Sequence, residues 1–123
     1  MNVEDMKKRT KQFGLRVVKL VESLPATKTG NAIGNQLLRS GTSVGANYRS
    51  ACRARSRPDF ISKASIALEE ADESQYWMEL LIESGVIPEN RLEGLIKEAD
   101  ELISILTASV KTAKKNQNLA RSN

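Results

Sequence analysis

Residues 36–51 read QLLRSGTSVGANYRSA, and this stretch decides the fold. At helical spacing its apolar and small residues form one seam, which starts just upstream and contains Ile33, Leu37, Gly41, Val44, Tyr48 and Ala51. A glycine inside a helix costs about 1 kcal/mol relative to alanine. A helix that holds both Gly41 and Gly45 therefore indicates that a neighbouring backbone packs closely against it. Asn47 lies beside the seam and needs hydrogen-bond partners if it is buried.

The first two helices can be placed on either side of a proline. Apolar residues at helical spacing predict a first helix over about Val3–Ser23, which ends before Pro25 because proline cannot continue a helix. The connection at residues 26–29 is short and polar. The second predicted helix, about Gly30–Ala54, contains the stretch quoted above.

Two further helices follow. Ser56 is suited to cap the third, Pro58 is tolerated in its first turn, and Gly85 is suited to end it. Pro88 opens the fourth, whose seam is widened by Leu95 and further apolar residues, Leu102 and Ile105. So wide a face predicts burial on two sides and hence an oligomer.

Together these elements predict an all-α, antiparallel up-down-up-down four-helix bundle, because short connections favour antiparallel neighbours. The predicted domain organisation is a bundle over residues 1–113 and a basic, disordered tail over residues 114–123, where helical periodicity is lost.

Charge is divided along the chain. Residues 1–57 hold 12 Lys and Arg against 3 Asp and Glu, whereas residues 58–110 hold 3 against 12. Residues 111–123 add 4 basic residues and no acidic ones. One interpretation is that the basic half packs against the acidic half, within or between subunits. The other is that part of the basic half faces outward and binds polyanions.

Two motifs carry a family resemblance. RSGTSVGANY at residues 39–48, followed by DFI at residues 59–61 and SIALEEADESQYWMELL at residues 65–81, resembles the bacterial four-helix-bundle proteins encoded in intervening sequences of the large-subunit ribosomal RNA gene. The accessory proteins of diversity-generating retroelements are similar. The resemblance implies rings of five subunits with basic surfaces and, in the retroelement branch, binding of nucleic acid and a reverse transcriptase. Arg49 stands near where many members have Glu.

Several kinds of active site are excluded by composition. The chain has no His and only one Cys, Cys52, so it cannot supply a Glu-x-x-His di-iron motif, a His/Cys zinc site or a Ser-His nucleophile. The glycines match no phosphate-binding loop. We therefore predict a protein without catalytic residues, metal or cofactor.

The acidic residues near the middle of the third helix have two interpretations: a cation site, or a charged face that pairs across the bundle. The family resemblance favours a structural polar network in which Glu69 or Glu73 reaches Arg39, Ser43 or Asn47. Such a network would fix helix register more than it adds stability.

Basic residues crowd the end of the second helix and the tail. The predicted nucleic-acid-binding residues are Arg49, Arg53, Arg55, Arg57, Lys114 and Lys115. Cations at a helix C-terminus are also ordinary partners of the helix dipole. Because the few aromatic residues lie in or beside apolar seams, phosphate contacts are expected to dominate over base stacking.

These observations predict a homo-oligomer, a pentamer by resemblance, that binds nucleic acid and most readily structured RNA. The rival interpretation is a structural or protein-docking scaffold, such as an accessory subunit for a reverse transcriptase. The polar start of the chain and the lack of a long apolar run predict a cytoplasmic protein with no membrane partner. RNA, DNA and protein stay open as ligands.

Overall fold

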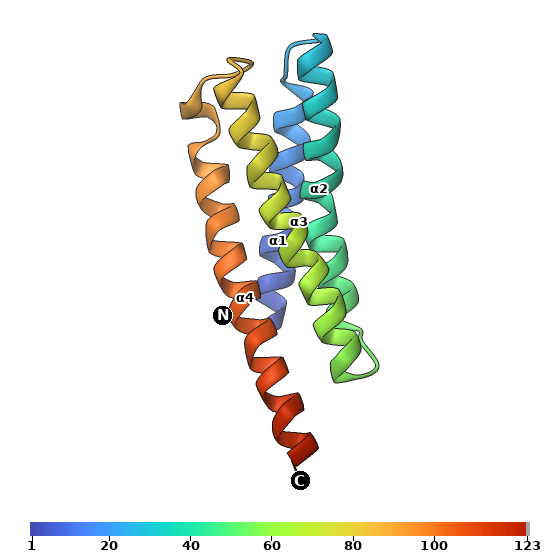
Figure 1. The fold of residues 1–123 in the computed structure, drawn as a ribbon. Coiled ribbons are helices and arrows are strands. Elements are labelled where there is room, and N and C mark those ends of the chain that lie inside the picture. The colour runs from blue at the N-terminus through green and yellow to red at the C-terminus, as the bar shows by residue number, and fades with distance from the viewer. Residues whose placement is uncertain (123) are drawn as a thin grey trace.

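The structure, a computed structural model, describes residues 1–122 and is an antiparallel four-helix bundle (Figure 1). Its elements are α1 (Val3–Glu22), α2 (Lys28–Cys52), α3 (Arg57–Glu83), the short 3-10 helix η1 (Glu89–Arg91) and α4 (Glu93–Ser122). No strand occurs among these residues. The predicted fold class is confirmed.

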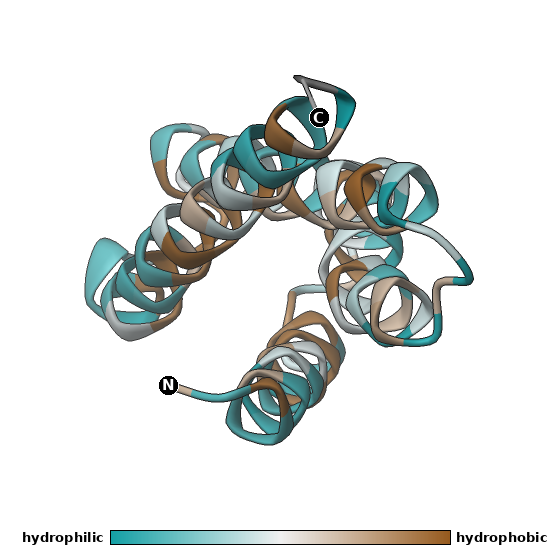
Figure 2. Ribbon diagram, turned by 90° about the horizontal axis from the view of Figure 1, so that it is seen from below, coloured by the Kyte–Doolittle hydropathy of each residue, from teal (hydrophilic) through white to brown (hydrophobic). Residues whose placement is uncertain are grey.

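The helices stand side by side in chain order. α2 packs against both α1 and α3, and α3 packs against α4, whereas α1 and α4 touch only sparsely. Seen along the bundle, apolar residues lie mainly on the inner sides of the helices (Figure 2). The core is therefore built from one stripe of each helix.

The seam of α2 is buried as predicted. Leu37, Val44 and Tyr48 are almost fully covered. A Cβ added at Gly41 would lie 2.7 Å from the Cγ2 atom of Val17, and one added at Gly45 would lie 3.2 Å from the Thr10 backbone. Both glycines therefore let α1 approach α2 closely, which confirms the interpretation of this stretch.

The predicted start and end of α3 hold at the atomic level. The Asp59 backbone N–H donates to the Ser56 side-chain oxygen at 3.2 Å, so Ser56 caps the helix. Gly85 has a φ of 79°, a left-handed conformation that suits glycine after a helix end. The expectation for Pro88 needs correction, because Pro88 precedes η1 and α4 begins only at Glu93.

The C-terminal segment differs from the sequence prediction. α4 continues through residues 114–122, where a disordered tail was expected. Residues 111–121 contain neither Gly nor Pro, and 8 of the 11 are Lys, Ala, Gln, Leu or Arg, which are good helix formers, so a helix needs no apolar face to persist here. These residues are mostly exposed, and the helix projects beyond the rest of the bundle (Figure 1).

The wide apolar face of α4 is largely covered within one chain. Leu95 and Leu102 are 5% and 0% exposed, respectively, and Ile105 is half-buried. The width of this face therefore does not by itself require a second subunit. The prediction of an oligomer has to rest on other surfaces.

Candidate nucleic-acid interface

The turn between α2 and α3 positions most of the predicted basic residues. α2 ends at Cys52, Arg53 is its C-cap, and α3 starts at Arg57. Arg49, Arg53, Arg55 and Arg57 are all exposed. Because the turn is short and capped at Ser56, their Cα atoms are held together at one end of the molecule.

The projecting part of α4 joins the same end. The Arg57 Nη1 atom donates to the Asn116 carbonyl oxygen at 3.0 Å, which ties the start of α3 to α4. Lys114 and Lys115 lie on this part of α4 and are exposed. We use the name basic end for the six residues Arg49, Arg53, Arg55, Arg57, Lys114 and Lys115.

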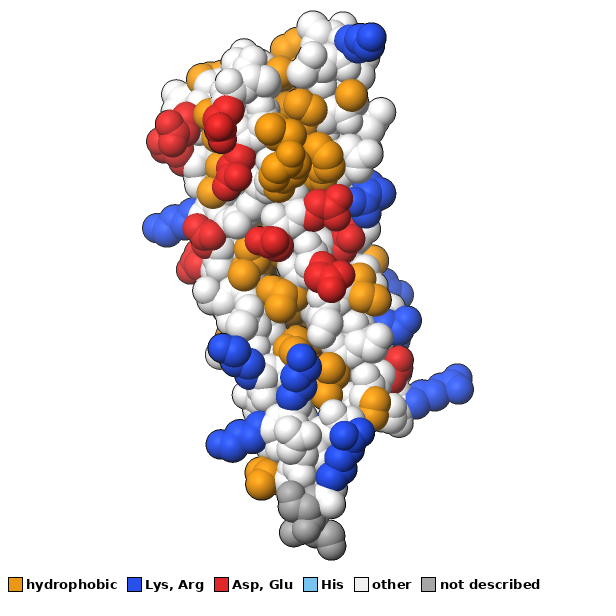
Figure 3. Space-filling view, in the orientation of Figure 1, with side chains coloured by type: hydrophobic (Ala, Val, Ile, Leu, Met, Phe, Trp, Pro, Cys, Tyr) orange, Lys and Arg blue, Asp and Glu red, His pale blue; other side chains and the backbone are white. Residues whose placement is uncertain are grey.

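An open depression of about 820 Å³ lies beside Arg57 at the basic end. Phe60 of α3 and Ile105 and Thr112 of α4 line it, together with Met1. Lys and Arg gather around the lower part of the face in Figure 3, and Asp and Glu lie mainly above them. On this face most acidic side chains therefore lie apart from the cations of the lower end.

The ion pairs show how far the basic half packs on the acidic half. Among the described residues, only Lys7, Arg9 and Arg39 pair with acidic side chains. Arg9 reaches Glu98 at 2.5 Å, which links α1 to α4 and raises the pKa of Arg9 through that hydrogen bond. None of the six residues of the basic end has such a partner within the described chain. Packing of opposite charges thus accounts for Arg9 and Arg39 and leaves the basic end unneutralised.

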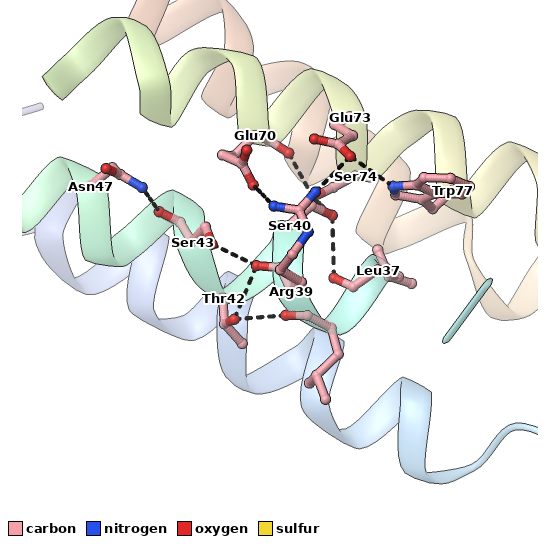
Figure 4. Close-up of polar contacts among 11 residues, drawn as sticks. Leu37, Arg39, Ser40, Thr42, Ser43, Asn47, Glu70, Glu73, Ser74 and Trp77 are labelled. Carbon is pink, nitrogen blue, oxygen red and sulfur yellow. Dashed lines mark hydrogen bonds and ion pairs between the residues drawn. The ribbon is translucent and has the colours of Figure 1, made fainter. Parts of the chain in front are cut away.

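A polar network joins α2 to α3 near the middle of the bundle (Figure 4). Arg39 forms ion pairs with Glu70 at 3.0 Å and with Glu73 at 2.6 Å. The Trp77 Nε1–H donates to Glu73 at 3.3 Å, which holds this carboxylate in place. The hydrogen bond to Glu73 and the charge of Glu70 raise the pKa of Arg39. The predicted pairing of Arg39 with Glu73 is therefore present.

Three members of the predicted network, Ser43, Asn47 and Glu69, take no part in the ion pairs between α2 and α3. The Asn47 side chain donates to the Ser43 carbonyl at 2.9 Å, and the Ser43 hydroxyl donates to the Arg39 carbonyl at 2.6 Å, so both bond within α2. Glu69 is exposed and forms no ion pair with the described residues. The reason is helical phase: one residue further on, Glu70 is rotated by about 100° and faces α2.

The sequence reasoning missed the buried part of this network. The Ser74 hydroxyl bonds the Ser40 hydroxyl at 2.9 Å, and both side chains are fully buried. Ser40 and Ser74 each lie three residues, or about one helical turn, after a buried apolar residue, Leu37 and Ala71 respectively. This spacing is the sequence signal that predicts their burial. Small hydroxyls at these positions let α2 and α3 come close while staying hydrogen-bonded.

Among the residues that the structure describes, no group of three or more His, Cys, Asp or Glu could hold a metal ion. In the same part of the chain, no helix is long and apolar enough to cross a membrane.

The two tyrosines differ in burial. Tyr48 is buried, which raises its pKa to about 12 with a contribution from Cys52, whereas Tyr76 is 53% exposed.

Comparison with known proteins places the chain. The family model for 23S rRNA-intervening sequence proteins matches residues 4–108. The chain belongs to this family. The match covers the four helices and stops shortly before the projecting part of α4, so the intervening-sequence family accounts for the bundle and four residues of the basic end but not for Lys114 and Lys115.

A solved relative agrees with this placement in the intervening-sequence family. A crystal structure of a protein of unknown function from the S23 ribosomal protein family of Bacteroides thetaiotaomicron VPI-5482 is 39% identical, with a TM-score of 0.84. The alignment covers 90% of this chain and 99% of that chain. No curated protein sequence matches. The comparisons therefore give the fold and a family of unknown function.

Proposed function

We propose that this family member is a non-enzymatic, homopentameric protein that binds structured RNA through its basic end. The observation that supports the proposal is that six exposed cations lie at one end of the molecule, with no acidic partner in the described chain. An arginine binds a phosphate through two parallel hydrogen bonds, and each neutralised phosphate releases counterions. These residues are therefore suited to the sugar–phosphate backbone.

A ring would multiply this effect. In a closed ring every subunit presents the same surface around the axis, so weak phosphate contacts add through multivalency. The five-fold state is drawn from the family resemblance. Sedimentation or light scattering at micromolar protein would then give a mass five times the 13.6 kDa of one chain.

The binding mode sets what the protein recognises. The cations lie on helix ends and on the surface of α4, and the aromatic residues nearest to them in sequence, Tyr48 and Phe60, are buried and half-buried, respectively. Backbone contacts position a protein on nucleic acid without reading its sequence. We infer that the protein selects the shape and charge density of a folded RNA, with slight preference for sequence.

The experiment compares two charge-matched variants. Arg53→Ala/Arg57→Ala removes two cations from the basic end, and Lys19→Ala/Lys28→Ala removes two exposed cations elsewhere, on α1 and α2. The two variants therefore have the same net charge as each other. A fluorescent RNA hairpin is titrated at several salt concentrations. The first variant should bind more weakly, and the slope of log K against log salt should decrease in magnitude by about 1.5, whereas the control should behave as the wild type.

The rival function, a protein-docking scaffold such as a reverse transcriptase accessory subunit, gives a different result. Absence of RNA binding even at low salt would reject the proposal and favour the scaffold. Equal weakening by both variants would show that net charge, and not the basic end, attracts the RNA.

A further inference from the structure

A groove runs along the outer side of α1 and α2. Its volume is about 390 Å³, and apolar atoms of Leu15, Val18 and Ala46 line it. Leu15 is 48% exposed, a high value for a leucine of a packed helix. Lys7, Lys11 and Arg49 also line the groove, so it combines apolar surface with positive charge.

The outer side of α3 has the opposite character. Its exposed residues Ile66, Glu69, Asp72, Tyr76, Glu79 and Glu83 follow one another at steps of three or four and therefore form one stripe along the helix. We call it the α3 stripe. Tyr76 is 53% exposed and Ile66 is 37% exposed. None of the four carboxylates forms an ion pair with the described residues.

We propose that the α3 stripe of one subunit docks into the α1–α2 groove of the next. This inference rests on the proposed ring and names the two surfaces that build it. Lys11 and Arg49, which have no ion pair in the described chain, and Lys7, which pairs with Glu4 at 3.3 Å, would face the carboxylates of the stripe. Tyr76 would enter the apolar groove beside Leu15 and Val18. Tyrosine is enriched among residues that dominate binding energy at interfaces, because it buries a large apolar area at low entropic cost.

The groove also matches part of the α3 stripe in length. The groove extends from Lys7 to Val18 on α1, which is about 16 Å at the rise of an α-helix, so it can take the part of the α3 stripe from Ile66 to Tyr76, about 15 Å long, and the rest of the stripe, to Glu83, would extend beyond it. An amphipathic helix laid in a groove is a common mode of recognition. Charge of one sign on each surface disfavours pairing of two grooves or of two stripes.

A contact of this kind can repeat from one subunit to the next, as a ring requires. The groove belongs to α1 and α2 and the stripe belongs to α3, so each subunit contributes different surfaces to its two neighbours. Such heterologous contacts close into a ring when the rotation per subunit divides a full turn. Arg53, Arg55 and Arg57, which we propose to bind RNA, do not line the groove, whereas Arg49 does. In the ring Arg49 would therefore face the stripe, and the other five residues of the basic end would bind the RNA.

The test uses charge reversal and its repair. Lys7→Glu/Lys11→Glu makes the groove acidic, and Glu69→Lys/Asp72→Lys makes the stripe basic. Each variant should assemble at least about tenfold more weakly in sedimentation, because like charges then face each other. The variant with all four substitutions should regain assembly. Lys28→Glu/Glu93→Lys, which reverses exposed charges outside both surfaces, is the matched control and should behave as the wild type.

Circular dichroism confirms that each variant is folded, and a second measurement avoids variants altogether. A carbodiimide joins amines to carboxylates in contact, so wild-type subunits should give cross-links between Lys11 and Glu69 or Asp72, found by mass spectrometry between isotopically distinct chains. The docking assignment would be overturned, but not the ring itself, if the wild type is multimeric and neither charge reversal weakens its assembly. The same conclusion would follow if a multimeric wild type lacks these cross-links. A monomeric wild type would overturn both.

Discussion

The contact between Gly41 and Val17 gives the sharpest prediction about stability. Replacing Gly41 by alanine adds one methyl group that would lie 2.7 Å from Val17 Cγ2, 2.8 Å from Cγ1 and 3.0 Å from Cβ. Ordinary carbon–carbon contacts are about 3.5–4.0 Å. Val17 is 0% exposed and β-branched, so it cannot rotate away into solvent. The helices α1 and α2 must therefore move apart.

Two opposing effects set the magnitude. Alanine is better than glycine in a helix by about 1 kcal/mol, which favours the variant. Overpacking of a well-packed core costs typically about 1–3 kcal/mol. Because the clash involves the branched carbon of Val17 and not only the end of a flexible side chain, the upper part of this range applies. We expect Gly41→Ala to lower the free energy of unfolding by about 1–2 kcal/mol.

Urea denaturation followed by circular dichroism measures this change at a fixed protein concentration, since assembly alters apparent stability. Gly94→Ala is the matched control. Gly94 lies in the first turn of α4, where the propensity gain is smaller than in a helix interior, and its Cβ would lie 3.2 Å from Arg16 Nη2, the end of a flexible side chain, so stability should not fall. In a double-mutant cycle, Val17→Ala should relieve Gly41→Ala by at least about 0.5 kcal/mol. A Gly41→Ala variant that is as stable as Gly94→Ala would refute the close-approach argument.

Four further outcomes can be measured on the same protein. Asn47→Ala should change stability by less than about 0.5 kcal/mol, because the Asn47 amide bonds only within its own helix, and a loss above about 1 kcal/mol would show that it has a partner elsewhere. Arg39→Ala should lower the free energy of unfolding only slightly, and less in high salt than in low salt, because the ion pair is exposed to solvent; a salt-independent loss would contradict this. Ser74→Ala should cost about 1 kcal/mol. The double variant with Ser40→Ala should cost less than the sum of the two single variants, because either substitution already removes the hydrogen bond that the two hydroxyls share. Burial raises the pKa of Tyr48 to about 12, above the ordinary tyrosine value of 10.0. The contribution of neutral Tyr48 to stability should therefore be present below pH 10 and be lost as the pH rises from 10 to 12. Tyr48→Phe should reduce that fall when melting is followed as a function of pH.

Helical periodicity was enough to place the bundle. The seam of α2, the Ser56 cap and the Gly85 end were all readable, because each depends on residues within a few positions of one another. The C-terminal part of α4, by contrast, could not be predicted from the sequence pattern. Loss of apolar periodicity shows where a helix leaves its bundle, but it does not show where the helix ends.

The polar network was predicted less well because it depends on the rotation of α3 about its own axis. Glu69, Glu70 and Glu73 are all compatible with a mid-helix acidic cluster, and only the neighbours decide which of them faces Arg39. The sequence also did not determine which cations of the basic end stay unpaired, because pairing depends on where the acidic half of the chain lies in the fold.

The polar residues of α2 are satisfied locally, and this bears on where function can reside. Thr42, Ser43 and Asn47 donate to carbonyls within α2. With Gly41 and Gly45, they give a helix that α1 and α3 can approach closely without leaving buried polar groups unpaired. The inner face of the stretch that decides the fold therefore serves packing, while its exposed residues Ala46 and Arg49 line the outer groove. The unpaired charges lie on helix ends and outer faces, where substitutions leave the core intact, so binding can vary on an unchanged bundle.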